Sequence, residues 1–405
     1  MTVSASSVLS WGGIFLAGFG VLTSTIFLLM VLVAAIRYRR RSTSARRTAL
    51  SLPEPLFPAV TVFKPVHGAE PRLEENLESF FLQDYPRFEL IFGARSANDP
   101  AIAIVEKLKQ RYPLVTVKIV FSGPPTWPNA KVFSLERMIA QAEHNYFVIS
   151  DSDVLAGADL LRNVIPPLLN PRVGLVTCMY RGVPEPDFWS TMEGLGKSVE
   201  MPSGVMVADM LEGMKFALGP VMATTREAIA KMGGIRQTAD YYSDDFELGN
   251  RIAAAGYEVQ LSHYLIDMSL IQRSLRRTFG DQLRWMKSTR YSRPRGHLGT
   301  GLTFAIPFGL LGLFAGVLGG QAAVGLWLVA ISLMNRIVQS LAVGWLVMRD
   351  RRSLFLCWLY PLRDLLGFVT WAGSYLGGDF SWRGETYRFG AGGRITAKER
   401  AAGGA

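Results

Sequence analysis

Short apolar runs alternate with helix-like segments between residues 59 and about 266. The runs are rich in Val, Ile and Phe, as buried strands are, and in the intervening segments apolar residues recur every three or four positions. The predicted strands are 59–63, 88–94, 115–121, 146–150, 173–180 and 257–266, and the predicted helices are 72–83, 100–112 and 132–143. This alternation favours a mainly parallel sheet covered on both faces, so the segment is predicted to be an α/β domain.

A longer apolar stretch precedes this domain. Residues 8–36 carry no charge over 29 positions, which is enough to cross a bilayer with a hydrocarbon core about 30 Å thick. A group of arginines follows directly, so the stretch is predicted to be a transmembrane anchor with its C-terminal side in the cytoplasm. A cleaved signal peptide is the alternative, but no basic stretch stands ahead of the apolar run.

Three further apolar stretches follow the domain, at 298–318, 322–348 and 354–376. The second carries Arg336, and the third carries Arg363 with Asp364. Charges inside a membrane are costly and usually face a cavity or one another. The third stretch is interpreted either as a full span or as a re-entrant hairpin broken at Pro361–Asp364, because the basic tail favours the cytoplasmic side.

A basic region links the domain to these stretches. Within 273–297 eight Arg or Lys residues stand against one acid, Asp281, and apolar residues are interleaved at near-helical spacing. A basic amphipathic helix of this type is predicted to lie in the headgroup plane of anionic lipid, with calmodulin-like or nucleic-acid binding as the alternative. The predicted organisation is an anchor (8–36), a cytoplasmic α/β domain (57–268), an interfacial region (269–297), membrane segments (298–378) and a basic tail (379–405).

Composition agrees with a protein that works at a membrane. Of the 405 residues 49% are hydrophobic, and the formal net charge is +10. A basic balance indicates nucleic acid or a membrane surface as partner, and the apolar segments favour the membrane. The two cysteines and four histidines lack metal-ligand spacing, so neither a disulfide framework nor a zinc site is predicted.

Two aspartates follow the predicted strand 146–150, in the stretch "SDSD". On an extended backbone Asp151 and Asp153 point the same way, so their charges repel unless a cation lies between them. Carboxylate oxygens are ligands that Mg²⁺ and Mn²⁺ prefer, and such an ion is often shared with substrate phosphates. A metal site is therefore predicted here, with a solvated turn or a helix N-cap as the alternatives.

A further acidic position occurs in "YYSDDFELGNRIAAAGYEV". Asp244 and Glu247 match a D-x-x-E capping box, which places Asp245 in the first turn of a helix ending at Gly256. A carboxylate there is a candidate general base for an attacking hydroxyl, and favourable placement against the helix dipole is the structural alternative.

Seven short motifs occur in order along the chain: FKPVHG (63–68), LESFFLQDYPRFEL (77–90), NDPAI (98–102), PNAKVFSL (128–135), SDSD (150–153), DDF (244–246) and LRW (283–285). From about 57 to 297 they resemble the ceramide glucosyltransferase family, which includes bacterial hopanoid-associated members. The resemblance implies a GT-A fold and inverting transfer of glucose or N-acetylglucosamine from a UDP-sugar to a lipid hydroxyl, such as that of ceramide or a hopanoid. It also implies Mg²⁺ or Mn²⁺ and a multi-pass protein of the bacterial inner membrane, with its catalytic domain in the cytoplasm.

The resemblance assigns roles to four aspartates. Asp99 and Asp151 match aspartates on the nucleotide side of the family's site. Asp153 completes D-x-D as a direct metal ligand, so Asp151 and Asp153 together are the expected metal site. Asp245 matches the general base.

Four basic and aromatic residues are assigned in the same way. Arg284 and Trp285 match the end of the family's (Q/R)-x-x-R-W signature, which lines the acceptor and diphosphate region. Lys64 and Lys131 lie in matching motifs and are expected to meet the diphosphate, with a solvated surface charge as the alternative for each. The signature's first position is Asp281 here, which puts the acceptor preference in question.

Two other functions share parts of this pattern. A processive polysaccharide synthase also carries D-x-D and R-W, but it needs more crossing helices to line a channel. A catalytically inactive lipid- or nucleotide-binding membrane protein has no use for a base at Asp245. A transporter is disfavoured because most of the chain reads as an α/β domain.

Overall fold

The computed structural model describes residues 5–51, 53–271, 274–382 and 385–398. The chain divides into two compact units. Unit 1 consists of residues 1–37, 186–207 and 272–393, and unit 2 consists of residues 38–185, 208–271 and 394–405. Unit 2 contains the α/β sheet, whereas unit 1 contains most of the apolar helices.

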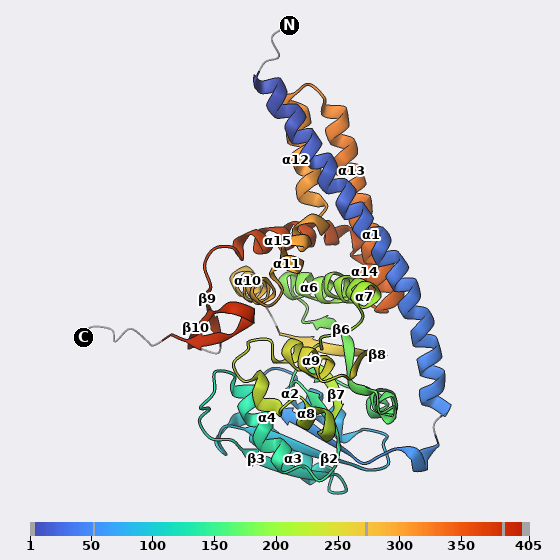
Figure 1. Cartoon of the computed structure of the whole chain (residues 1–405), viewed down its shortest axis with the longest axis vertical. Helices are drawn as coiled ribbons and strands as arrows, with labels where there is room; N and C mark the ends of the chain where they lie inside the picture. Colours follow the sequence, from blue (N-terminus) through green and yellow to red (C-terminus); the bar gives the residue numbers. More distant parts are fainter. Residues whose placement is uncertain (1–4, 52, 272–273, 383–384, 399–405) are drawn as a thin grey trace, which may run out of the picture. The chain divides into compact units, whose positions relative to one another are not determined.

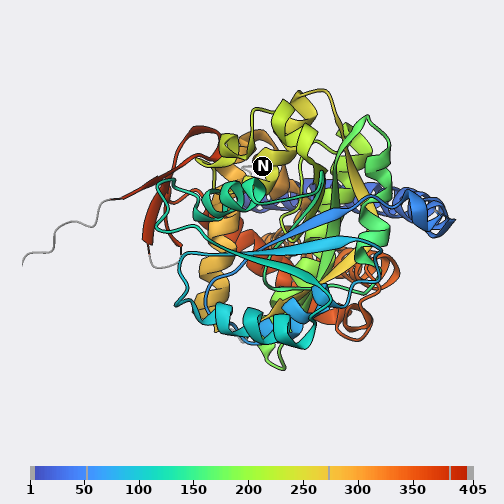
Figure 2. The ribbon, with the colours of Figure 1, turned by 90° about the horizontal axis from the view of Figure 1, so that it is seen from below.

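The sheet of unit 2 is shown from below in Figure 2. Its strands are ordered β3 (Thr116–Phe121), β2 (Phe88–Ala94), β1 (Val60–Pro65), β4 (Tyr146–Ser150), β7 (Val221–Thr225), β6 (Val173–Pro184), β8 (Glu258–Leu270) and β5 (Val154–Leu155). β3, β2, β1 and β4 run parallel, and β6 is parallel to β8. β7 is antiparallel to both β4 and β6, and β5 is antiparallel to β8.

The predicted strands all occur, and the α/β class is confirmed. The run β3–β2–β1–β4 and the β6–β8 pair are parallel as predicted, but the sheet is mixed, because β7 enters between β4 and β6 against their direction. The apolar pattern does not reveal β7, whose five residues are too few to distinguish a strand from the start of a helix. Its pairing with β4, with Val221 opposite Ser150, is what makes it a strand.

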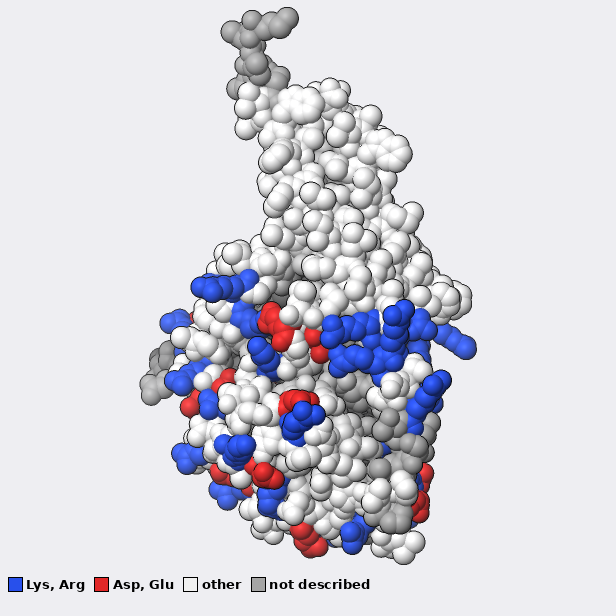
Figure 3. Space-filling model, turned by 45° about the vertical axis from the view of Figure 1, so that its right-hand side comes forward, with Lys and Arg blue, Asp and Glu red and all other residues white. Residues whose placement is uncertain are grey.

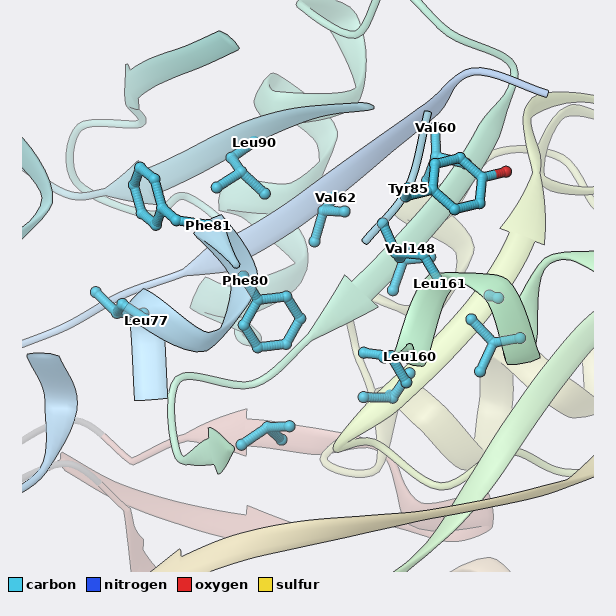
Figure 4. Close-up of a cluster of buried hydrophobic side chains, with 14 of the residues drawn as sticks. Val60, Val62, Leu77, Phe80, Phe81, Tyr85, Leu90, Val148, Leu160 and Leu161 are labelled. Carbon is cyan, nitrogen blue, oxygen red and sulfur yellow. The ribbon is translucent and has the colours of Figure 1, made fainter. Parts of the chain in front are cut away.

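Helices cover both faces of the sheet. Those lying wholly within unit 2 are α2 (Leu73–Phe81), α3 (Pro100–Arg111), α4 (Ala130–Ala140), α5 (Leu160–Val164), α8 (Arg226–Lys231) and α9 (Asp244–Ala254). On one face Val62 and Val148 pack with side chains of α2, α3 and α5, and Figure 4 shows part of this cluster. Phe63, at the alternate position, lies on the other face. There α4 packs so closely that a methyl group at Gly93 would meet Met138 Sδ at 2.4 Å.

Unit 1 is built mainly from helices. They are α6 (Phe188–Leu195), a π-helical turn (Gly196–Glu200), α10 (Leu275–Ser292), α11 (Pro294–Thr300), α12 (Ile306–Leu318), α13 (Ala322–Gln339), a second π-helical segment (Ser340–Val347), α14 (Arg351–Phe355) and α15 (Tyr360–Gly373). The strands β9 (Asp379–Trp382) and β10 (Glu385–Phe389) pair antiparallel. α1 (Ala5–Ser51) and α7 (Met201–Glu212) have residues in both units, and β11 (Ile395–Ala397) belongs to unit 2.

Two helices of the described residues are long and apolar enough to cross a membrane, Val8–Arg47 and Ala322–Val347. A third candidate combines Pro294–Thr303 with Ile306–Leu318, which are bent by 52°. α12 and α13 lie beside the first half of α1 (Figure 1), where Ser10 Oγ donates to the Ala315 carbonyl at 2.7 Å. On the face shown in Figure 3, this part of unit 1 carries no charged side chain.

The stretch 354–376 is not one long helix. A 3₁₀ turn at Cys357–Leu359 separates α14 from α15. The 14 residues of α15 span about 21 Å, which is short of a hydrocarbon core of about 30 Å. The interruption lies at Cys357–Leu359, whereas Pro361–Asp364, where the re-entrant interpretation placed its break, lies inside α15.

Two charged side chains of these apolar stretches, Arg336 and Asp364, form an ion pair with each other. Arg336 Nη1 lies 3.0 Å from Asp364 Oδ1, and both side chains are buried. Asp364 Oδ2 accepts hydrogen bonds from the backbone N–H groups of Ala305 and Ile306, at the start of α12. A buried charge is tolerated when it is paired in this way, and the pair connects α12, α13 and α15.

Candidate active site

Lys64 and the turn after β4 meet at the carboxyl ends of the parallel strands. The Lys64 side chain is fully buried, and its ammonium group donates to Ser150 Oγ at 3.1 Å and to the backbone carbonyl of Asp151. It also lies 3.8 Å from the centre of the Phe80 ring. Burial lowers the pKa of Lys64 to about 7, against the opposing effect of Asp151 and Asp153. Lys64 thus lies beneath the D-x-D turn, and this burial does not support the expected direct contact with a diphosphate.

Lys131 lies between two acidic side chains. Its Nζ is 2.7 Å from Asp151 Oδ1 and 3.4 Å from Asp244 Oδ2. Asn129, the N-cap of α4, accepts a hydrogen bond from the Lys131 backbone N–H and donates one to Asp244 Oδ1. Burial opposes the charge on Lys131, but Asp151 and Asp244 outweigh it and hold the pKa of Lys131 above its usual range. Lys131 is therefore an ammonium ion that joins two carboxylates.

Asp245 lies in the first turn of α9, as predicted, but the predicted capping box is wrong. Ser243 is the N-cap without a side-chain capping bond, so Asp244 is the first helical residue rather than the cap. Asp245 Oδ2 accepts from the Gly219 backbone N–H at 2.7 Å, and Oδ1 accepts from the Phe246 N–H at 2.8 Å. Burial, assisted by the neighbouring Asp244, raises the pKa of Asp245 to about 6. A carboxylate with a raised pKa is suited to accept a proton near neutral pH.

Gly219 lies where two of these carboxylates come together. A methyl group at Gly219 would be 3.0 Å from Asp245 Oδ2 and 3.5 Å from Asp151 Oδ2. The next residue, Pro220, accepts a hydrogen bond from the Asp151 backbone N–H at 3.2 Å. Since β7 runs antiparallel to β4, the residues before β7 reach the edge of the sheet at which β4 ends. The β4–β7 pairing therefore places Asp151 and Asp245 around one small volume.

Asp151 and Asp153 fit a divalent cation only with further oxygen ligands. Over the part of the chain that the structure describes, no group of three or more His, Cys, Asp or Glu side chains is arranged to hold a metal ion. The two carboxylates are hard oxygen ligands of the type that Mg²⁺ and Mn²⁺ take, and Mg²⁺ usually shares its shell with water and substrate phosphate. The residues thus fit an ion held jointly with a diphosphate.

Asp99 makes a different set of contacts. It is the N-cap of α3, and its Oδ1 accepts from the backbone N–H groups of Ala101 and Gly68 at 3.0 and 2.8 Å. Its Oδ2 lies 3.1 Å from His67 Nδ1. Asp99 therefore joins the start of α3 to the segment after β1, and these contacts do not include the carboxylates around Gly219.

Arg284 and Trp285 belong to α10 of unit 1, whereas the residues above belong to unit 2. Arg284 Nη2 lies 3.0 Å from Asp281 Oδ1, one turn earlier on the helix. The ammonium group of Lys197 lies 4.0 Å from the centre of the Trp285 ring. The unexpected acid in the signature is thus an ion-pair partner of the signature arginine.

The sequence alone assigns no site role to three members of this cluster. Asn129 carries a usable signal, since a polar N-cap directly before a helix positions the first turn that bears Lys131. Asp244 is visible only as a helix cap, although the adjacent acids of "DDF" could have suggested a pair. Gly219 carries no signal, because its part in the site depends on the pairing of β7.

A mixed sheet with an acidic turn after β4 and a base-like carboxylate beside it agrees with the GT-A glycosyltransferase fold that the sequence resemblance implies. The chain belongs to glycosyl transferase family 21, whose model matches residues 26–395. The resemblance to the ceramide glucosyltransferase family is thereby confirmed.

Several ceramide glucosyltransferases are similar to this chain. Ceramide glucosyltransferase 3 of Caenorhabditis elegans is 25% identical over 358 residues, which cover 84% of this chain and 74% of that protein. For ceramide glucosyltransferase 1 of the same organism the identity is 26% over 211 residues, and the match covers 52% of this chain but only 45% of that protein. The Komagataella phaffii ceramide glucosyltransferase is 36% identical over 114 residues, 27% of this chain and 22% of that protein. A solved mannosyltransferase of Pyrobaculum calidifontis is 19% identical, with a TM-score of 0.48 over 89% of this chain and 99% of that one.

Proposed function

We propose that this chain transfers glucose or N-acetylglucosamine from a UDP-sugar to the hydroxyl group of a membrane lipid, with inversion at the anomeric carbon. Ceramide and a hopanoid are the acceptors that its relatives and its motifs favour. The observation that carries the proposal is the meeting of Asp245 with Asp151 at Gly219. This contact places Asp245, the proposed proton acceptor, beside Asp151, which belongs to the expected sugar-donor side of the site.

In the proposed reaction Asp245 takes the proton of the acceptor hydroxyl. As that proton leaves, the oxygen attacks the anomeric carbon from the face opposite the diphosphate, and the bond between this carbon and the diphosphate oxygen breaks. The Gly219 N–H donates to Asp245 Oδ2 and the Phe246 N–H donates to Oδ1, so that these two hydrogen bonds hold the carboxylate in one orientation. UDP leaves with the electron pair of the broken bond.

The donor side is assigned to the D-x-D turn. Asp151 and Asp153 would hold Mg²⁺ or Mn²⁺, which stabilises negative charge on a departing diphosphate. Lys64 holds the main chain of this turn through the Asp151 carbonyl, and Lys131 holds the Asp151 carboxylate. We assign Asp99 to the nucleotide side through the loop that it ties to α3.

The acceptor side is assigned to the membrane. Helices of candidate spanning length anchor the chain, with the α/β unit on the cytoplasmic side where the arginines after Ile36 are expected. Arg284 and Trp285 are assigned to the acceptor and diphosphate region on the strength of the signature alone. A lipid hydroxyl at the headgroup level then meets the base without leaving the bilayer.

The test uses the full chain in membranes, with labelled UDP-glucose and UDP-N-acetylglucosamine and a panel of ceramide, hopanoid and diacylglycerol acceptors. Product is measured in the organic phase by chromatography. Asp245→Asn should lower turnover by about 10²- to 10⁴-fold while UDP affinity is kept, because only proton transfer is lost. Glu247→Gln is the matched control, since Glu247 lies on the same turn of α9 and pairs with Arg251 instead. If Asp245→Asn keeps near-wild-type turnover, Asp245 is not the base.

A further inference from the structure

A pocket of about 480 Å³ in unit 1 is strongly basic. It is bordered by α10 and β9, and of the residues assigned to the transfer reaction only Arg284 lines it. Four cationic side chains of α10 line it: Arg276, Arg277, Arg284 and Lys287. Two carboxylates, Asp281 and Asp379, share the lining.

Each of these two carboxylates already forms an ion pair with an arginine. Asp281 Oδ1 is 3.0 Å from Arg284. Asp379 accepts two hydrogen bonds, at 2.6 and 3.2 Å, from Arg388, which is not part of the lining. Asp281 and Asp379 therefore leave Arg276 and Arg277 without a described ion-pair partner, although the charge of Asp379 also acts on Lys287.

Two of the remaining cations, Arg276 and Arg277, lack an acidic partner among the described residues, whereas Lys287 feels the charge of Asp379. Among the described residues Arg276 and Arg277 form no ion pair, and both side chains are exposed. Lys287 is buried, and its ammonium group donates to the neutral backbone carbonyl of Asp379 at 2.9 Å. Within the described residues, two arginines without an acidic partner and the Lys287 ammonium group thus line one open volume, which is an arrangement that an anion would stabilise.

The position of these arginines on the helix adds to the imbalance. Arg276 and Arg277 lie in the first turn of α10, which contains no acid. The N-terminal end of a helix carries partial positive charge, so cations there are unfavourable and an anion is favourable. The pocket supplies both the space and the converging side chains for that anion.

The remaining walls of the pocket favour an amphiphile over a small inorganic ion. Leu283 and the buried Phe380 line it beside the cations. Leu275, at the start of the same helix, is half exposed. After α10 the chain passes through α11 into α12, part of a candidate membrane span. An anion that brings apolar chains with it suits such surroundings.

We propose that this pocket binds the phosphate of an anionic phospholipid that is neither the donor nor the acceptor of the transfer reaction. The phosphate is held by Arg276, Arg277 and Lys287, and the first part of the acyl chains contacts Leu283. The site ties unit 1 to anionic lipid of the surrounding bilayer. The lipid site does not depend on the proposed transfer reaction, because Arg276, Arg277 and Lys287 have no assigned part in that reaction. Arg284 lines the same pocket but is not among the three residues that hold the phosphate.

Direct binding of soluble short-chain lipids tests the proposal. The full-length protein in a neutral detergent is titrated with dioctanoylphosphatidylglycerol by calorimetry, and dioctanoylphosphatidylcholine, inorganic phosphate and UDP serve as comparison ligands. The phosphatidylglycerol should bind, and its affinity should fall as salt is raised. Equal affinity for phosphatidylcholine, or displacement of the lipid by UDP or inorganic phosphate at matching concentrations, would overturn the assignment to an anionic lipid.

Two pairs of variants locate the binding. Arg276→Gln with Arg277→Gln should weaken phosphatidylglycerol binding about thirtyfold. Arg295→Gln with Arg351→Gln removes the same charge from exposed positions of unit 1 outside the lining and should change binding by less than about threefold. Ser381, an exposed residue of the lining, gives a second pair: Ser381→Glu should weaken binding by repulsion, whereas Ser381→Gln should not. Equal effects within either pair would show that the pocket is not the site, and the Ser381 pair still decides if the double arginine variant does not fold.

Discussion

Replacing Lys131 with methionine tests whether the acidic cluster is held together by charge. The substitution keeps a long unbranched side chain but removes the ammonium group that lies 2.7 Å from Asp151 and 3.4 Å from Asp244. Asp245, which also interacts electrostatically with Lys131, loses the same counter-charge. Three carboxylates then stay close together in a largely buried place.

The two contacts set the size of the effect. At an effective dielectric constant of about 20, they correspond to gross attractions of about 6 and about 5 kcal/mol. Much of this is offset by the hydration that Lys131 loses on burial, so removal of one partner from a buried pair typically costs about 3 to 5 kcal/mol. Lys131 is 14% exposed, which favours the lower end of that range. A loss of about 3 kcal/mol corresponds to a fall of about 6 to 12 °C in the thermal midpoint of a domain of this size.

Thermal unfolding of the full-length protein in detergent, with EDTA and without nucleotide, measures this loss. Lys131→Arg keeps the charge and should keep most of the midpoint. Adding Asp244→Asn to Lys131→Met removes one stranded carboxylate, so part of the lost stability should return, with a coupling of about 1 to 3 kcal/mol. A Lys131→Met midpoint within about 2 °C of wild type, or a double variant less stable than the single one, would refute the electrostatic account.

Three further outcomes follow from the same site. Because the pKa of Lys64 falls to about 7 in the folded protein, the unfolded chain binds more protons between about pH 7 and 10.5, and stability should rise with pH across that window. Lys64→Met should remove this rise in melting curves measured at several pH values, and it should also slow sugar transfer. A Lys64→Met protein whose stability rises with pH as steeply as that of the wild type would contradict this reasoning. Because burial raises the pKa of Asp245 to about 6, kcat/KM should fall as pH drops through about 6, where the base becomes protonated; a profile flat from pH 5 to 8 speaks against Asp245 as the base. Asp153→Ala and chelation by EDTA should each weaken UDP binding by at least about tenfold in calorimetry, and unchanged affinity for Asp153→Ala takes this residue out of the metal shell.

The local pattern of the chain was sufficient for most elements of the α/β unit. β1, β2, β3, β4, β6 and β8 coincide with apolar runs, and α2, α3 and α4 coincide with periodic segments, because burial on a covered sheet selects such residues directly. The start of α9 was misplaced by one residue, since Ser243 and Asp244 are both acceptable caps and the sequence offers no means to choose.

β7 and the site that depends on it could not be read in the same way. A five-residue strand between longer elements becomes a strand only by pairing with β4 and β6. Gly219 therefore had no visible role, although its N–H binds Asp245. Lys64 was expected to meet the diphosphate because its motif places it at a strand end, yet the side chain turns inward beneath Asp151, and a strand position does not specify that direction.

The sequence by itself determined the α/β class, the apolar segments, the D-x-D turn and the family, because each depends on residues that are close together in the chain or that follow a short repeat. The tertiary structure alone decided which charges meet: Lys131 with Asp151 and Asp244, Asp245 with Gly219, and Arg336 with Asp364. The physical reason is one of range. The apolar patterns of strands and helices repeat every few residues, so they can be recognised along the chain. The electrostatic contacts of a site join residues dozens of positions apart, and only the folded sheet and the packed helices set those distances.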